Sequence, residues 1–456
     1  MRLAVAVACA IGGACSVASA QAADWVGTYT LPRGSDPVAI SVSVHGAKAG
    51  VALGPGHSGT TVVGVKTTGG RLRFSFPGLP AALAFDGRIH GRSLAGSVTQ
   101  GKLRGELRLA RGTSRVLPLL GVYRAADGGA VAVMQAKGLA PWLVEIPSGA
   151  THGIGASLTV GERLGDTAGN GSIVVERDGI AWNGAHYRRV SLRQREVRVG
   201  VAAATLTLPV GPGPFPAVVM VHGSGPQQRD EFQTFAAYCE LLGIAVLADD
   251  KRGVGQSGGT YPGERATDST VAVLAEDVQA EARFLAALPQ VDRKRVGVLG
   301  DSQAGWIIAL AASREPAVRW AVPIVGPTVS VDETDAWAEL AGKGVSPPSG
   351  SEESMLAQVR ARGAGGFDPR PSLRKLTIPA LWIFGDDDRN VPTKLSVEAL
   401  QQLRPGHDFS WVVLPMTHTP IELPTGLFSS LPASHGFVRG FFPALGDWLR
   451  GHGLTE

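Results

Sequence analysis

The sequence predicts an α/β fold with a mostly parallel sheet, preceded by an all-β region. Two patterns support this prediction. From about residue 195 onward, short β-branched apolar runs alternate with stretches of helical periodicity, which is the rhythm of βαβ units. Between about residues 24 and 190, apolar and polar residues alternate in short runs separated by glycine-rich turns, which is typical of antiparallel sheets.

The chain opens on the features of an export signal. Met1-Arg2 precedes an apolar stretch over residues 3–14, and Ala18-Ser19-Ala20 offers a small-x-small cleavage site. We therefore expect residues 1–20 to be a signal peptide, too short for a permanent membrane anchor, and the mature protein to be secreted or periplasmic. Lipidation at Cys15 is the alternative.

Composition narrows the classes of function. The 456 residues carry a formal net charge of only +4 with scattered Lys and Arg, so we expect no nucleic-acid partner. No spacing of the His-Glu-x-x-His or paired Cys-x-x-Cys kind occurs, so neither a metal nor a cofactor is expected. After removal of the leader, Cys239 is the only cysteine left, which excludes an intrachain disulfide.

The all-β region is expected to form two submodules, residues 24–116 and 117–190, each curled into a sandwich or a barrel. Gly27-Thr28-Tyr29 and Gly121-Val122-Tyr123 open two similar stretches, which suggests a boundary near Leu117. Two roles stay open for this region. It is either a packing and solubility domain or a module that binds a cell-envelope ligand.

A candidate nucleophile lies between a predicted strand and a predicted helix. Ser302 follows the β-branched run at 295–298 and precedes the helical run at 307–313. A sharp strand-to-helix turn needs small residues two positions either side of the serine, and Gly300 and Ala304 occupy those positions. With 61 glycines in the chain this pattern also arises by chance, so a purely structural turn is the alternative.

Four other predicted strands end in loops with polar residues. Phe215–Val221 runs into His222-Gly223-Ser224-Gly225, and residues 244–248 run into the loop from Asp249 to Ser257. Residues 378–384 run into a turn with three consecutive acids, Asp386-Asp387-Asp388, and residues 409–415 are followed by Met416-Thr417-His418.

This order of loops strongly resembles the α/β-hydrolase family over residues 195–456. The family has an HG-x-G loop after its third strand, a D-x-R-G-x-G-x-S loop after its fourth, then the serine elbow, an acid turn and a histidine. The resemblance implies a catalytic triad of Ser302, Asp388 and His418. Asp386 and Asp387 are the alternatives for the acid, and His435, just before a final helix expected at 436–450, is the rival for the base.

The resemblance also implies how an oxyanion would be met. The backbone N–H groups of Ser224 and Gln303 would form the oxyanion hole. His222 and Arg252 are expected to fix their loops rather than to act on a substrate.

An insertion at about 328–376 is expected to form a cap over Ser302, with helices at 335–340 and 352–361 and a loop at 342–350. The leading hypothesis is an exported serine carboxylesterase that cleaves a small or medium-sized ester. A serine aminopeptidase is the alternative, since the insertion holds acids that could meet a free ammonium, namely Asp332, Glu333, Asp335, Glu352 and Glu353. A β-rich binding protein with an inactive hydrolase domain is the alternative from another class.

Overall fold

The computed structural model describes residues 25–31, 38–45, 48–53, 61–76, 82–111, 119–134, 142–154, 158–160, 171–344, 346–420 and 437–455. The predicted signal peptide, Cys15, Leu117 and His435 lie outside these residues. No helix within the described ranges is long and apolar enough to cross a membrane.

The first group of strands closes into an antiparallel barrel. The strands follow one another in chain order, and β1 pairs with β8 to complete the ring. Alternate side chains point inward and form a separate core, in which Phe74 and Phe85 stack with ring centroids 4.7 Å apart. The strands are β1 (Trp25–Thr30), β2 (Val38–His45), β3 (Lys48–Leu53), β4 (Thr61–Thr68), β5 (Arg71–Phe76), β6 (Leu83–His90), β7 (Ser93–Gln100) and β8 (Leu103–Ala110).

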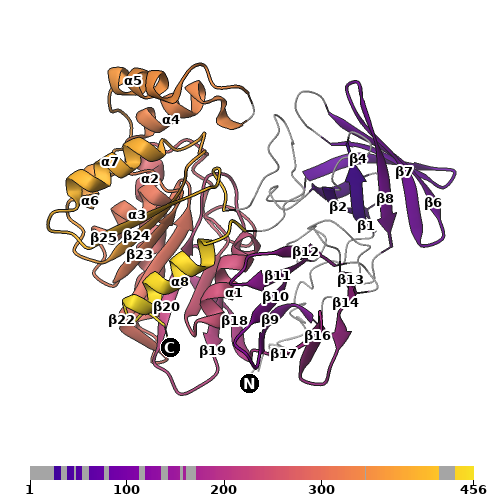
Figure 1. The fold of residues 1–456 in the computed structure, drawn as a ribbon, viewed down its shortest axis with the longest axis horizontal. Helices are drawn as coiled ribbons and strands as arrows, with labels where there is room; N and C mark the ends of the chain where they lie inside the picture. Colours follow the sequence, from indigo (N-terminus) through magenta and orange to yellow (C-terminus); the bar gives the residue numbers. More distant parts are fainter. Residues whose placement is uncertain are drawn as a thin grey trace, which may run out of the picture.

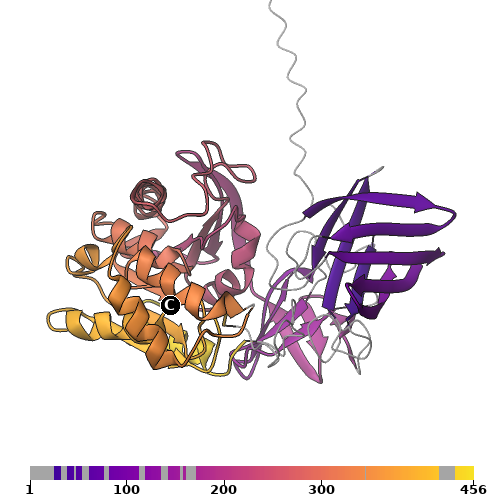
Figure 2. The ribbon, with the colours of Figure 1, turned by 90° about the horizontal axis from the view of Figure 1, so that it is seen from above.

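A second antiparallel sheet has the order β12-β11-β10-β9-β17-β16-β15, beside a short β13-β14 ladder. Figures 1 and 2 show this sheet against the α/β domain, with the barrel set apart from the helices. Its strands are β9 (Gly121–Ala125), β10 (Ala130–Met134), β11 (Trp142–Ile146), β12 (Thr151–Gly153), β13 (Thr159–Val160), β14 (Gly171–Ser172), β15 (Val174–Val175), β16 (Gly179–Trp182) and β17 (Ala185–Arg189).

The two faces of this second sheet bury different cores. Tyr123, Val131 and Leu143 pack within the β-rich region itself. Ala132 and Val144, whose side chains face the other way, share one apolar cluster with the α/β domain. The second sheet therefore shares a hydrophobic core with the α/β domain, whereas the barrel has a core of its own.

The α/β domain is built on a sheet of order β18-β19-β21-β20-β22-β23-β24-β25. The hairpin β18–β19 is antiparallel, β19 pairs antiparallel with β21, and every pairing from β21 to β25 is parallel. The strands are β18 (Leu192–Val199), β19 (Ala202–Pro209), β20 (Phe215–Val221), β21 (Ala245–Asp249), β22 (Val291–Asp301), β23 (Trp320–Ile324), β24 (Ala380–Gly385) and β25 (Phe409–Leu414).

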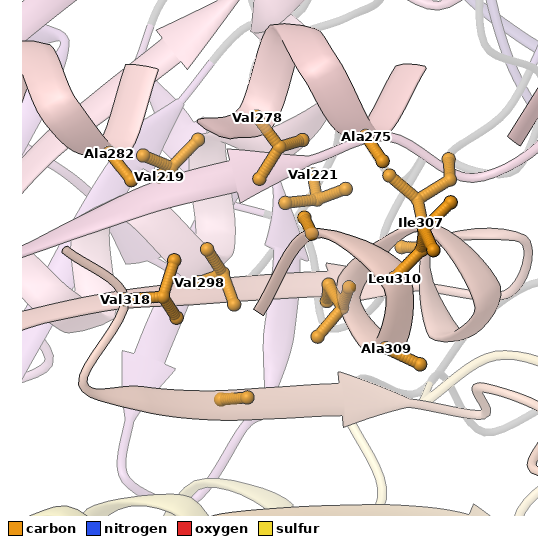
Figure 3. Packing of buried hydrophobic residues seen from close by; sticks show 14 of the residues in the cluster. Val219, Val221, Ala275, Val278, Ala282, Val298, Ile307, Ala309, Leu310 and Val318 are labelled. Carbon is orange, nitrogen blue, oxygen red and sulfur yellow. The ribbon is translucent and has the colours of Figure 1, made fainter. Parts of the chain in front are cut away.

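Helices cover both faces of this sheet, which explains why its central strands are continuously apolar. Figure 3 shows Val219, Val221 and Val298 packed beneath α2 (Asp268–Ala286) and α3 (Ala304–Ala312). Val218 and Met220 point to the opposite face, toward α1 (Gln233–Leu241) and α8 (Phe441–Gly451). The helix α7 (Thr393–Leu403) adds to the first face, and the short η2 (Arg229–Phe232) precedes α1.

Between β23 and β24 lie α4 (Val331–Leu340), η3 (Gly342–Gly344), α5 (Glu352–Arg362) and α6 (Arg370–Leu373). Helix α4 begins four residues before the predicted start. Ser330 caps it by accepting from the backbone N–H of Glu333, whose side chain accepts in turn from the backbone N–H of Ser330. The final helix α8 begins later than predicted, at Phe441, because Gly440 holds a left-handed conformation with φ of +96°.

Candidate active site

Ser302 lies at the turn between β22 and α3 with a left-handed backbone, φ +56°. Its N–H donates to the carbonyl of Ile324 on the adjacent strand β23, at 2.9 Å. A Cβ on Gly300 would lie 2.1 Å from the carbonyl oxygen of Val221 and 2.8 Å from Cβ of Ala304. The turn is thus tight enough to exclude a side chain at Gly300, and a non-glycine residue at positive φ is a strain found at functional sites.

The structure brings Ser302, His418 and Asp388 into one hydrogen-bonded line. The Nε2 of His418 lies 2.8 Å from the Oγ of Ser302, and its Nδ1 lies 2.9 Å from the Oδ2 of Asp388. The three residues come from the ends of three different parallel strands, β22, β24 and β25. This line supplies what a weak hydroxyl nucleophile needs, which is an adjacent base held by a carboxylate.

The acid turn separates its three carboxylates by burial. The side chain of Asp388 is fully buried, and its Oδ1 accepts from the backbone N–H groups of Asn390 and Val391 at 2.8 and 2.9 Å. Asp386 and Asp387 are exposed, and Asp387 pairs with Arg389 instead. Only Asp388 of the three contacts His418.

The electrostatic surroundings raise the pKa of His418 above its ordinary value. Burial disfavours the imidazolium, but the charge of Asp388 and its hydrogen bond outweigh this desolvation, and the nearby Asp301 adds to the effect. An imidazole that gains a proton readily in this place is suited to accept one from the serine.

Two backbone N–H groups in the turns after β20 and β22 are candidates for binding a substrate oxygen. Ser224 is exposed in the turn after β20, and Gln303 follows Ser302 at the start of α3. Within the described part of the chain, neither N–H donates to a protein acceptor. These are the two donors that the resemblance to the α/β hydrolases implies for an oxyanion hole.

Side chains of the loops after β20 and β21 bind groups of neighbouring elements. The Nε2 of His222 lies 2.8 Å from the carbonyl oxygen of Asp249, and Arg252 donates through Nε to Asp277 of α2 at 2.8 Å. Both residues thus bind protein groups, in keeping with the loop-fixing roles expected of them.

The insertion after β23 reaches the acid turn. The indole N–H of Trp337, on α4, donates to the backbone carbonyl of Asp388 at 3.0 Å. The indole of Trp306, on α3, likewise donates to the carbonyl of Val329 just before α4, at 2.9 Å. The inserted helices are therefore tied to the elements that carry the serine and the acid.

The acids of this insertion do not gather into one cluster. Glu333 closes the cap of α4 and pairs with Arg370, and Glu352 pairs with Lys394 on α7. Asp332, Asp335 and Glu353 are exposed. Among the described residues, no group of His, Cys, Asp and Glu side chains could hold a metal ion.

The strand order, the helices on both faces of the sheet and the tight turn at Ser302 resemble the α/β-hydrolase fold. The hydrogen-bonded line of serine, histidine and aspartate is the arrangement that serine hydrolases use.

Known proteins resemble the same region. A family model described as serine aminopeptidase, S33, matches residues 213–350. Esterase EstD of Thermotoga maritima is 30% identical over 235 residues, which are 45% of this chain and 54% of that protein. The chain thus spans about half the length of this curated relative.

Two solved structures are also similar. An esterase of Pyrococcus furiosus covers 57% of this chain and 91% of its own, at 16% identity and a TM-score of 0.40. The structure of Est1E from Butyrivibrio proteoclasticus with ferulic acid covers 57% of this chain and 98% of its own, at 18% identity and a TM-score of 0.37.

Two contributors to the site were missed in the sequence. Trp337 lies in a stretch whose pattern says only that it is helical, and nothing in that pattern indicates that its indole meets the acid turn. Lys251 is buried, and its Nζ contacts the turn after β20. A signal for it existed, because a lysine at the end of a continuously apolar strand is unusual, but no role followed from its position alone.

Proposed function

We propose that the protein is an exported serine hydrolase that cleaves carboxylic esters of small or medium size through an acyl-enzyme on Ser302. The observation that supports this most strongly is the line from Ser302 through His418 to Asp388, with separations of 2.8 and 2.9 Å. The catalytic roles of these three residues are part of the proposal.

In the first half of the reaction, the Oγ of Ser302 attacks the ester carbonyl while the Nε2 of His418 takes its proton. The carbonyl oxygen becomes an oxyanion, and the N–H groups of Ser224 and Gln303 donate to it. Donors of this kind are each worth about 3–4 kcal/mol of transition-state stabilisation. When the tetrahedral intermediate collapses, the C–O bond to the alcohol breaks, and the imidazolium gives its proton to the departing alkoxide.

In the second half, a water molecule attacks the acyl carbonyl and His418 takes one of its protons. The same two N–H groups meet the second oxyanion. Collapse releases the carboxylic acid and returns the proton to the Oγ of Ser302, which restores the resting enzyme. Asp388 keeps the imidazole in the tautomer that presents a bare Nε2 to the serine.

An ester is favoured over an aminoacyl amide by the leaving group and by the insertion. An alkoxide leaves with less protonation than an amine requires, so an unspecialised triad cleaves esters more readily. A peptidase that trims free N-termini needs carboxylates to meet the ammonium. The insertion's acids are either paired with basic side chains or exposed, as described above.

Serine aminopeptidase activity is the second candidate, and the family match over residues 213–350 favours it. The two are separated by comparing kcat/KM for p-nitrophenyl esters of about C2 to C8 acids with that for aminoacyl-p-nitroanilides. We expect the esters to be cleaved faster. Higher values for the anilides would replace the esterase by a peptidase, and the absence of both activities and of fluorophosphonate labelling would favour a binding protein with an inactive domain.

For the barrel we propose binding to the anionic surface of a cell envelope. Residues 25–111 contain eleven Lys and Arg against three Asp and Glu. The exposed Arg71, Arg88 and Arg108 stand in register across β5 to β8, with Ala95 between the last two. Asp86 pairs with Arg71 and Arg73, and Glu106 pairs with Arg108, so the excess of positive charge comes from the eleven basic residues against three acids. Such a face attracts anionic lipid head groups.

Binding is tested by sedimenting the protein with phosphatidylglycerol vesicles and with phosphatidylcholine vesicles. We expect sedimentation with the anionic vesicles only, weakening as salt is added and lost in the Arg88→Glu, Arg108→Glu double variant. Equal sedimentation with both lipids, or none with either, would refute the proposal.

Export is tested separately by mass spectrometry of the mature N-terminus, which we expect near Gln21. A chain that retains Met1 would refute export.

A further inference from the structure

Lys251 is a charged side chain buried beneath the proposed oxyanion hole, with 2% of its surface exposed. It follows β21 in the loop from Asp249 to Ser257. Its Nζ donates to the carbonyl oxygen of Gly223 at 2.6 Å, to that of Gly225 at 3.2 Å, and to Oε1 of Gln303 at 3.0 Å. The Nζ also lies 5.8 Å from the ring centroid of Tyr261, which adds a cation–π contact.

These acceptors belong to the two elements that carry the proposed oxyanion donors. Gly223 and Gly225 flank Ser224 in the turn after β20. Gln303 follows the nucleophile on the turn between β22 and α3, and its side-chain amide donates in turn to the carbonyl of Glu264 at 3.1 Å. One ammonium thus joins the loop that positions the first N–H to the residue that supplies the second.

Three acceptors require three N–H donors. An ammonium has three and a neutral amine has two, with a lone pair in place of the third. Deprotonation would therefore leave one of the three acceptors without a donor, in a site where a buried unpaired carbonyl is costly.

We propose that protonated Lys251 is a positioning residue, which holds the Ser224 and Gln303 N–H groups in register for the oxyanion. It touches no reacting atom. The inference rests on the proposed serine hydrolase function and extends it to a residue outside the triad and the donors themselves.

The groups facing Lys251 come from several elements. Asp249 of β21, Asp301 of β22, Glu231 of η2 and Glu264 favour its charge, while His222 is close enough to be influenced by it. It also lines a cavity of about 20 Å³ together with Asp277 and Glu281 of α2. Burial outweighs these carboxylates and lowers the pKa of Lys251 to about 8.

This pKa gives activity and stability opposite pH dependences. As pH rises through about 8, the folded protein loses the third donor, so kcat should fall. The unfolded chain keeps that proton up to about pH 10.4, so between these two values it binds more protons than the folded chain. The free energy of unfolding therefore rises with pH in this range. A fall in kcat above pH 8 would then not be caused by unfolding through this group.

The test is the Lys251→Met variant, measured with a short p-nitrophenyl ester from pH 6 to 9.5. Lys294→Met is the matched control, because Lys294 is exposed near the start of β22, the strand whose other end leads into Ser302. We expect Lys251→Met to lower kcat about 10²-fold, within the cost of removing an oxyanion donor, with KM changed less than about threefold. The decline of kcat above pH 8 should be present in the wild type and in Lys294→Met, and absent in Lys251→Met.

A second variant keeps the test decisive if Lys251→Met does not fold. Gln303→Met removes the acceptor that joins Lys251 to the turn at Ser302, together with the amide's hydrogen bond to Glu264, and keeps Lys251 bound to Gly223 and Gly225. It should lower kcat about tenfold, again with little change in KM. The inference would be overturned if Lys251→Met or Gln303→Met kept the kcat of the wild type, or if only KM rose. It would also be overturned if the decline of kcat above pH 8 persisted in Lys251→Met. A wild type that neither cleaves esters nor reacts with a fluorophosphonate would refute the proposed function instead.

Discussion

The left-handed backbone of Ser302 lifts its hydroxyl out of the turn and toward Nε2 of His418. If these residues work as a unit, then Ser302→Ala and His418→Ala should each lower kcat at least about 10⁴-fold with the melting temperature little changed. The comparison variant is His435→Ala, which should retain most activity. If His435→Ala abolishes turnover and His418→Ala does not, the base is wrongly assigned.

The surroundings of His418 predict the acid side of the pH profile. The base must be neutral to act, and its pKa is raised above the ordinary value of about 6.5. The profile of kcat/KM should therefore fall on acidification with an inflection above about 6.5. Asp388→Asn removes the charge that raises this pKa, so any residual activity should persist to lower pH. An inflection that stays in place in Asp388→Asn would show that another group titrates.

Residue identity was predictable where spacing along the chain determines it, and less so where contacts across the fold determine it. Ser302 and His418 follow predicted strands, which places both at one edge of a parallel sheet. Three adjacent acids leave the choice of partner open in the sequence, and the structure places Asp388 there through the N–H groups of Asn390 and Val391. Lys251 meets residues up to 52 positions away, which no local pattern reveals.

The elbow is an element that depends on missing side chains. A Cβ at position 300 would meet the carbonyl oxygen of Val221 at 2.1 Å, and backbone there cannot swing aside as a side chain could. Gly300→Ala should therefore cost about 1–3 kcal/mol or more and displace Ser302, so both stability and kcat fall. Ala304→Gly, which only removes a methyl group, should cost at most about 1 kcal/mol and keep activity. Denaturant unfolding and kcat of both variants test this, and a neutral Gly300→Ala would contradict the tight turn.

Among the other elements, the strands of the α/β domain were the most predictable, because strands buried on both faces give unbroken apolar runs. Helix α7, Thr393–Leu403, is one of the helices between strands that the periodicity after residue 195 predicts. The start of α4 was misplaced because apolar periodicity begins after the first turn. The Ser330 and Glu333 capping pair marks the true start and is legible in the sequence.

The barrel and the second sheet differ in how their cores relate to the α/β domain. The barrel has its own cluster, whereas Ala132 and Val144 share one with α1 and α8. A chain beginning at Leu119 should then keep kcat/KM within about twofold. One beginning at Leu192 should lose about 3 kcal/mol or more of unfolding free energy, since each buried aliphatic side chain is worth about 1.5–3 kcal/mol. Equal stability of the two truncated chains would contradict the shared core.

The alternating pattern of residues 24–190 predicts antiparallel sheets in two submodules, but it does not predict which of the two packs against the α/β domain. Alternation tells which side chains are buried and leaves open what covers them. The shared core arises from residues more than 80 positions apart, such as Val144 and Tyr238, and only the folded chain brings these together.

The central claim is that Ser302 carries an acyl group during ester cleavage. Trapping tests it most directly: the protein is mixed with p-nitrophenyl acetate, quenched in acid within the first turnovers, digested, and examined by mass spectrometry. The account predicts one acetyl group on the peptide that contains Ser302, lost with time in the wild type and never formed in Ser302→Ala. Ester turnover with the acetyl group on another residue, or turnover undiminished in Ser302→Ala, would contradict it.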